Sequence, residues 1–151
     1  MTVKYVQLSP GSAPPPLESH AFLAIFVIAE KVDDEWREKI CRWVVDEGCL
    51  FMMAWGVDCV LWHDAVDQAN IEDFPDSDIP WDRFVMTTWH PRETLQKAFR
   101  FAHVAASHPE VDFLRPILID ICSEDRSMYL RALFRRAKQM ANRLQCSPGA
   151  G

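Results

Sequence analysis

Residues 21–29 read AFLAIFVIA, a continuous apolar run that includes several β-branched side chains. A run that is apolar on both faces is typical of a central strand in a parallel sheet. Asp33 and Asp34 follow it as N-cap candidates, and Gly48 is placed to end a helix. Between them, apolar residues recur at the spacing of an amphipathic helix: Trp36, Ile40, Trp43 and Val44. The stretch from 21 to 48 therefore predicts one strand followed by one helix.

The same alternation occurs three more times along the chain. Further strands are predicted at residues 50–55 (LFMMAW), 84–89 (FVMTTW) and 116–121 (PILIDI). A second helix is expected from Asp58 to about Asn70, with inward-facing residues Val57, Val60, Leu61 and Ala65.

The third and fourth helices are placed by their start signals. His90-Pro91 is expected to begin the third, because proline is preshaped for the first helical position. Its predicted core stripe is Leu95, Ala98, Phe99, Ala102 and Ala105. Ser123 is expected to cap the fourth helix, with the buried stripe Tyr129, Leu133, Ala137, Met140 and Leu144.

Strands that alternate with helices predict a single three-layer α/β domain over residues 19–146. Its sheet is expected to be four-stranded and mainly parallel, in the flavodoxin-like (Rossmann-like) order 2-1-3-4. That order places the first helix on one face and the next two on the other. Residues 1–18 are expected to form an arm and a proline-rich linker, in which Val3–Leu8 is either an edge strand or an extended arm. Residues 147–151 are predicted to be a disordered tail.

Composition restricts the classes of partner. The net charge is −6, and residues 1–121 carry 10 Lys+Arg against 20 Asp+Glu, whereas residues 122–151 carry 6 against 2. An acidic body disfavours nucleic acid, whose phosphates reward dense positive charge. The longest apolar run has nine residues, too few for a membrane span, and no secretory signal is evident. Five cysteines without a CxxC pair indicate reduced thiols and a cytoplasmic protein.

Ligands of open parallel sheets bind beyond the carboxyl ends of the strands, where the strand order reverses. In the expected order, Glu30 and Thr88 to His90 flank that point, while Asp58 and Asp120 follow or end neighbouring strands. The candidate binding residues are therefore Glu30, Asp58, Thr88, Trp89, His90 and Asp120. Structural roles stand beside these: Trp89 as a lid on the core, His90 as a local cap, and Asp120 as a paired group in an apolar strand.

Recognised catalytic signatures are not found. The five glycines form neither GxGxxG nor a P-loop, so no nucleotide cofactor is expected. A magnesium site at Asp120 would need a second acidic residue next to it, which the sequence does not have. The acidic loop 72–82 lacks the glycine of a calcium-binding EF-hand loop. Zinc has three candidate ligands, Cys59 and His63 at i, i+4 on one helix face and His90, but a fourth ligand is not evident. No metal site is therefore predicted, and a nucleophile at Cys122 or Ser123 has no GxSxG context.

Residues 81–90 (WDRFVMTTWH), with 95–102 and 117–121 after them, resemble a family of small uncharacterised bacterial proteins. The string FVMTTWH carries most of the resemblance, which covers about the middle third of the chain. It implies an intracellular bacterial protein of one domain, and it brings no activity or ligand with it.

These observations favour a non-catalytic binding or protein-interaction domain, such as an adaptor, immunity or defence-associated protein. The expected partner is another protein or a peptide, with a homodimer as one form of this. The alternative is a small-molecule-binding protein or an enzyme with its site at the carboxyl ends of the strands, built on Asp120, His90 and Glu30. A small-ligand site should be concave, whereas an interface should be a flatter exposed apolar patch.

Overall fold

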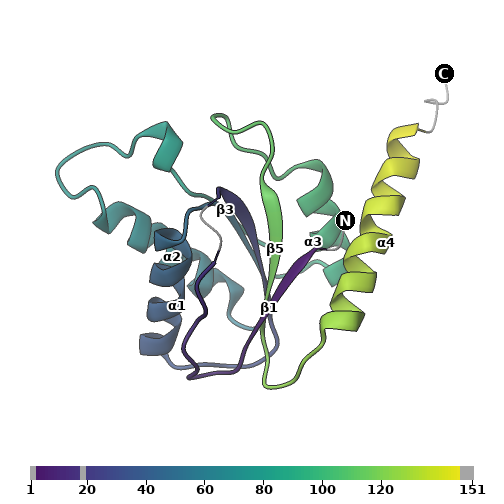
Figure 1. Ribbon diagram of the computed structural model, residues 1–151, viewed down its shortest axis with the longest axis horizontal. Coiled ribbons are helices and arrows are strands. Elements are labelled where there is room, and N and C mark those ends of the chain that lie inside the picture. The colour runs from purple at the N-terminus through teal and green to yellow at the C-terminus, as the bar shows by residue number, and fades with distance from the viewer. Residues whose placement is uncertain (1–2, 18–19, 147–151) are drawn as a thin grey trace.

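The computed structural model describes residues 3–17 and 20–146 and shows one parallel sheet of five strands with two helices on each face (Figure 1). The strands are β1 (Lys4–Leu8), β2 (Phe22–Ile28), β3 (Cys49–Gly56), β4 (Met86–Trp89) and β5 (Arg115–Ile121). The helices are α1 (Asp34–Asp46), α2 (Cys59–Glu72), α3 (Leu95–Val104) and α4 (Ser127–Cys146), with a short 3₁₀ turn, η1 (Trp81–Arg83). The α/β class is confirmed, and the N-terminal segment forms a fifth strand. The predicted tail 147–151 lies outside the described residues.

The strand order is β1-β5-β2-β3-β4, and the predicted order is wrong. The expectation paired β2 with β4, whereas β2 lies between β5 and β3. Polarity explains the difference. β5 is buried along most of its length and takes a central position, whereas β4 contains Thr87 and Thr88, has no fully buried residue and takes the edge.

The order of the strands determines the faces of the helices. The chain steps from β2 to β3 to β4 in one direction, and right-handed crossovers then put α1 and α2 on the same face. The return from β4 to β5 runs the other way, so α3 lies on the opposite face, and α4 packs beside it (Figure 1). The expectation that the second helix would share a face with the third is therefore wrong.

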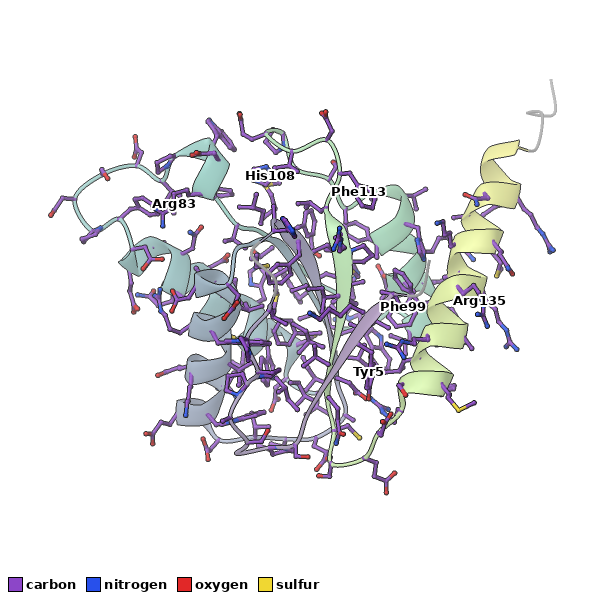
Figure 2. All side chains as sticks on the ribbon, viewed as in Figure 1. Tyr5, Arg83, Phe99, His108, Phe113 and Arg135 are labelled. Atoms are coloured by element: carbon purple, nitrogen blue, oxygen red, sulfur yellow. The ribbon has the colours of Figure 1, made fainter. Side chains whose placement is uncertain are left out.

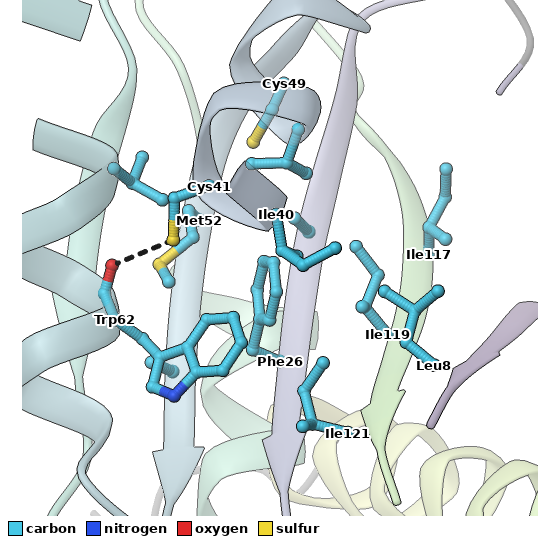
Figure 3. Close-up of a cluster of buried hydrophobic side chains, with 14 of the residues drawn as sticks. Leu8, Phe26, Ile40, Cys41, Cys49, Met52, Trp62, Ile117, Ile119 and Ile121 are labelled. Carbon is cyan, nitrogen blue, oxygen red and sulfur yellow. Dashed lines mark hydrogen bonds between the residues drawn. The ribbon is translucent and has the colours of Figure 1, made fainter. Parts of the chain in front are cut away.

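Each face of the sheet has its own apolar core. Beneath α1 and α2, Phe26, Ile40 and Trp62 pack together, and the Cys41 thiol donates to the Trp62 carbonyl at 3.6 Å (Figure 3). The buried stripe of α2 differs from the predicted one and consists of Cys59, Trp62, Val66, Ala69 and Asn70. Of the residues predicted to face inward, Val57, Val60 and Leu61 are exposed.

Two helices begin later than predicted. Thr94 caps α3 by accepting a hydrogen bond from the Lys97 amide, so His90-Pro91 lies in the turn before the helix. The core stripe of α3 is otherwise as predicted, except that Ala105 is exposed. α4 begins at Ser127, whose amide donates to Asp125, and Ser123 is not its cap. The buried residues of α4 are Leu130, Leu133, Phe134, Ala137 and Ala141, while Tyr129, Met140 and Leu144 are exposed.

The proline-rich segment 9–16 is a fixed crossover that joins β1 to β2 along α1 (Figure 1). The indole N–H of Trp36 donates to the Ser12 carbonyl at 2.9 Å, and that of Trp43 donates to the Pro15 carbonyl at 2.9 Å. Glu47 accepts the Leu17 amide at 3.0 Å. The two tryptophans therefore hold an extended chain where α/β folds usually have a helix.

Among the helices of the described part of the chain, none has the length and apolar character needed to cross a membrane.

Candidate functional site

The reversal of strand order lies between β2 and β5, not between β2 and β4 as predicted. From β2 the chain leaves towards α1, and from β5 it leaves towards α4 on the other face. Glu30 and Ser123 therefore meet at this point. Glu30 accepts hydrogen bonds from the backbone amide of Ser123 and, at 2.9 Å, from its hydroxyl. These bonds hold the pKa of Glu30 below its ordinary value, and they tie the two loops together at this junction.

Asp120 is fully buried and fully partnered. The Tyr5 hydroxyl donates to its Oδ2 at 2.6 Å, Nε of Arg126 donates to the same oxygen at 3.1 Å, and the Arg126 Nη2 group donates to Oδ1. The Tyr5 oxygen also accepts the Arg126 amide at 3.0 Å, which places Tyr5 at the start of α4 (Figure 2). Burial, and then the hydrogen bond to Asp120, raise the pKa of Tyr5. The carboxylate therefore joins β5, β1 and the entry to α4, which is a structural arrangement.

Asp58 begins α2 through its backbone and not through its side chain. It has a positive φ of 54° and makes no side-chain cap, while its carbonyl accepts the Leu61 amide at 2.9 Å. The helix therefore begins next to Asp58, as expected, without a cap from its carboxylate.

The three candidates at the end of β4 point to two different faces. On the α3 side, Thr88 Oγ1 lies 3.0 Å from Nε2 of His90, whose Nδ1 lies 3.1 Å from Glu93. His90 is buried against the ring of Phe101, at 4.8 Å between centroids. On the α2 side, the Trp89 ring packs on His63 at 4.5 Å and remains 46% exposed.

The six predicted residues consequently form several separate groups rather than one rim. Glu30 and Asp120 are hydrogen-bonded within the protein near the β2–β5 junction. Thr88 and His90 are hydrogen-bonded to each other at the end of the edge strand β4. Trp89 alone presents a large exposed side chain. Within residues 3–17 and 20–146, no group of three or more His, Cys, Asp or Glu side chains is placed to hold a metal ion.

A continuous surface flanks the open edge of β4, and the sequence did not point to most of it. Helix α2 lies against this edge. The Thr87 hydroxyl donates to Asp67 of α2 at 2.7 Å, and the Trp89 ring packs on His63 of α2. His63 Nδ1 lies 2.9 Å from Asp64, and its Nε2 lies 3.5 Å from Asp67. We call this surface the β4-edge face and define it by Val60, His63, Asp67 and Ile71 of α2 with Thr87 and Trp89 of β4.

The β4-edge face continues into a cavity at the amino end of the strands. This cavity, of about 470 Å³, is lined by Ile71, Phe74, Ser77, Asp78, Ile79, Trp81 and Phe84. The Trp81 ring lies 5.5 Å from that of Phe84 and is 62% exposed. A second cavity, of about 520 Å³, opens at the same amino edge near Asp46, Asp73 and Asp82. Arg83, which lines it, lies at this end of the molecule with His108 and Phe113 (Figure 2).

The surface residues could have been found from one signal. Val57, Val60, Leu61 and Ile71 cannot all face the core of a helix whose buried stripe includes Trp62 and Val66. Apolar residues that lie off the buried stripe are exposed, and exposed apolar residues that form a contiguous patch favour an interaction site.

Comparison with known proteins identifies a family for this chain. A model for a domain of unknown function, DUF7684, matches residues 3–137. The chain belongs to this family. The region that matches DUF7684 contains all five strands and helices α1 to α3, so the family match covers the whole sheet. The resemblance to a family of uncharacterised proteins is therefore confirmed. No curated protein and no solved structure matches this DUF7684 chain.

Proposed function

We propose that this DUF7684 protein is a non-catalytic protein-interaction domain and that the β4-edge face is its binding surface. One observation carries the proposal. Exposed apolar side chains gather beside an unpaired sheet edge, namely Val60 (42% exposed), Ile71 (54%) and Trp89 (46%). Large apolar groups at such a site favour a partner that buries them, because burial contributes roughly 25 cal/mol per Å² of apolar surface. Tryptophan is also enriched among the residues that dominate binding energies.

The setting of this interaction is part of the same proposal. The free, buried thiols of Cys41, Cys49, Cys59 and Cys122 support a reducing compartment, since none of them forms a disulfide. We place the protein in the bacterial cytoplasm as an adaptor, immunity or defence-associated component. The acidic composition supports a protein partner over nucleic acid.

The alternative, a small-ligand site or an enzyme at the carboxyl ends of the strands, receives less support. Its three residues, Asp120, His90 and Glu30, are all engaged in hydrogen bonds within the protein. The two cavities described above lie at the other end of the sheet. A hydrogen-bonded set of this kind stabilises loops and does not require a substrate.

Site-specific photo-crosslinking tests the proposal. A photoreactive phenylalanine analogue at Ile71, introduced in the native host, should give a protein adduct of defined mass. The adduct should disappear when Trp89→Ala is added, because the two positions share the surface. The control position is Met128 on α4, which is 86% exposed and lies on the other face of the sheet. Equal adducts from both positions, or none from Ile71, would refute the assignment of the surface.

A further inference from the structure

We infer that the open edge of β4 takes up an extended, positively charged segment of the partner as an additional strand. This inference rests on the proposed function and assigns the mode of binding and the chemistry of the partner. Three features of the described residues carry it: the hydrogen-bonding groups along β4, the composition of the strand, and the charge around it.

The edge of β4 presents hydrogen-bonding groups that the fold does not use for pairing. β4 pairs with β3 on one side, and within the described chain no strand pairs with its other side. The His90 amide donates to the Ala54 carbonyl of β3 at 2.9 Å. Because the direction of backbone groups alternates along a strand, the N–H and C=O groups of Thr87 and Trp89 point away from β3. An extended chain lying along β4 could form backbone hydrogen bonds with these outward-pointing groups.

The protein itself fills the first position of this edge. The Val85 amide lies on the same side as those of Thr87 and Trp89, and it donates to the side-chain carbonyl of Asn70 at 3.0 Å. The Asn70 amide group in turn donates to the Arg83 carbonyl at 3.0 Å. Asn70 therefore occupies the place of a neighbouring strand at the amino end of β4. The unfilled part of the edge begins at Thr87, where the exposed Trp89 follows.

β4 lacks the charged and proline residues that protect many edge strands. Natural edge strands are blunted with lysine, proline or inward charges, because unprotected edges pair with other chains. The opposite edge strand, β1, contains Lys4, and its preceding carbonyl at Val3 accepts a hydrogen bond from Arg131 at 3.0 Å. β4 reads MTTW, with no charge and no proline, and threonine and tryptophan both favour strands. Its shortness and its surroundings are what limit pairing.

The charge around β4 selects the partner. Residues 57–89 contain eight carboxylates and a single basic residue, Arg83, a net charge of −7 in a chain whose net charge is −6. Two of the eight, Glu72 and Asp73, pair with Arg42 of α1, which leaves the segment acidic. Asp64 and Asp67 lie directly on the helix that overhangs the edge. A segment rich in lysine or arginine would be attracted, whereas an acidic one would be repelled. A second copy of this chain is disfavoured for the same reason, since pairing two β4 edges would bring both sets of carboxylates together.

The probe for this inference is a short N-acetylated peptide that alternates lysine and valine, with a glutamate–valine peptide as its charge control. Binding is followed by NMR on the full-length protein. We expect saturable binding of the basic peptide, weaker at higher salt, with slowed amide exchange at Thr87 and Trp89. Peptides N-methylated on alternate residues distinguish the two edges of the bound strand. One methylated set should bind about tenfold more weakly and the other should bind as the parent peptide does.

Variants of the protein supply the second arm. Thr87→Pro removes the outward N–H and leaves the β3–β4 bonds in place, and it should weaken the basic peptide by about tenfold. Thr87→Val is its matched control, because it keeps the N–H and removes only the hydroxyl that bonds Asp67. If Thr87→Pro fails to fold, the methylated peptides on the unchanged protein decide the question.

Three results would overturn the inference. Loss of binding in Trp89→Ala, with no effect of Thr87→Pro or of either methylated peptide, would show that the face binds without strand addition; the proposed function would then stand. No saturable binding of the basic peptide would exclude the assigned chemistry, and the crosslinking experiment would still judge the proposed function separately. Protection of Thr87 and Trp89 by self-association alone would assign the edge to a second copy.

Discussion

Replacement of Asp120 by asparagine separates a structural carboxylate from a functional one. The carboxylate is fully buried and accepts hydrogen bonds from the Tyr5 hydroxyl and from two nitrogens of Arg126. Asparagine keeps one acceptor oxygen, replaces the other with a donor and removes the charge that faces the guanidinium. In the variant, the amide N–H₂ of the asparagine therefore faces the N–H or O–H donors of Arg126 or Tyr5, and the asparagine side chain is buried from water.

The size of the effect follows from the exposure of the partner. Removing one member of a buried ion pair costs about 3–5 kcal/mol, since the remaining charge is left without compensation. The Arg126 side chain is 28% exposed and can regain part of its hydration, so we expect the lower end, about 3 kcal/mol. In a domain of this size, that lowers Tm by about 6–12 °C. Tyr5→Phe removes one bond to the same carboxylate and should cost about 1–3 kcal/mol.

Urea unfolding monitored by tryptophan fluorescence measures these free energies in the full chain. Glu124→Gln, an exposed carboxylate in the same loop, is the matched control and should stay within about 0.5 kcal/mol of the wild type. The double variant of Tyr5 and Asp120 should lose less than the sum of the single losses, because both act on one cluster. If Asp120→Asn is as stable as the wild type within about 0.5 kcal/mol, with an unchanged m-value, the structural assignment of Asp120 is refuted.

Three further predictions concern backbone, pH and thiol chemistry. Gly56→Ala should destabilise far more than Gly48→Ala. Both glycines have φ above 100°, which costs alanine about 1–2 kcal/mol, but only at Gly56 would the new Cβ lie 2.2 Å from a backbone oxygen; similar losses in urea unfolding would contradict this. The raised pKa of Tyr5 stabilises the fold below the unfolded value of about 10, and this contribution is lost as the pH rises above it. Unfolding free energy should thus fall more steeply above about pH 10 in the wild type and in the control Tyr129→Phe than in Tyr5→Phe, and parallel curves would argue against it. Burial raises the pKa of Cys49 to about 12, so mass-spectrometric mapping should find no iodoacetamide on this residue in the native protein and full labelling after unfolding.

Local elements of this fold are predictable from sequence, because each depends on nearby residues. The run at Phe22–Ile28 is apolar on both faces, and Asp33 caps the next helix by accepting the Trp36 amide at 2.7 Å, as its position suggested. Helix starts are less secure where two signals compete. Thr94 prevails over Pro91 because its hydroxyl satisfies a helix amide, whereas proline only lacks one.

Strand order and site geometry depend on partners that lie far apart in the chain. The two threonines of β4 could have indicated an edge strand, but the preference for a common sheet order outweighed them in the prediction. Asp120 was singled out correctly as an acid that needs a partner. Its partner Tyr5 comes from 115 residues earlier, and no local pattern predicts that contact. The same reason applies to Glu30, which bonds to Ser123 in a loop far along the chain, whereas His90 is satisfied locally by Thr88 and Glu93.

The position of β5 has a consequence for the synthesis of this chain. β5 pairs with both β1 and β2, so β1 has no neighbour in the described sheet until residues 115–121 have been made. At about 5–20 residues per second, a ribosome needs roughly 5–25 s to synthesise the chain from β1 to the end of β5. During that interval one edge of β2, an entirely buried strand in the finished protein, is open to water and to other nascent chains. A product truncated before residue 115 is therefore expected to aggregate, and chaperone dependence should end abruptly once β5 emerges.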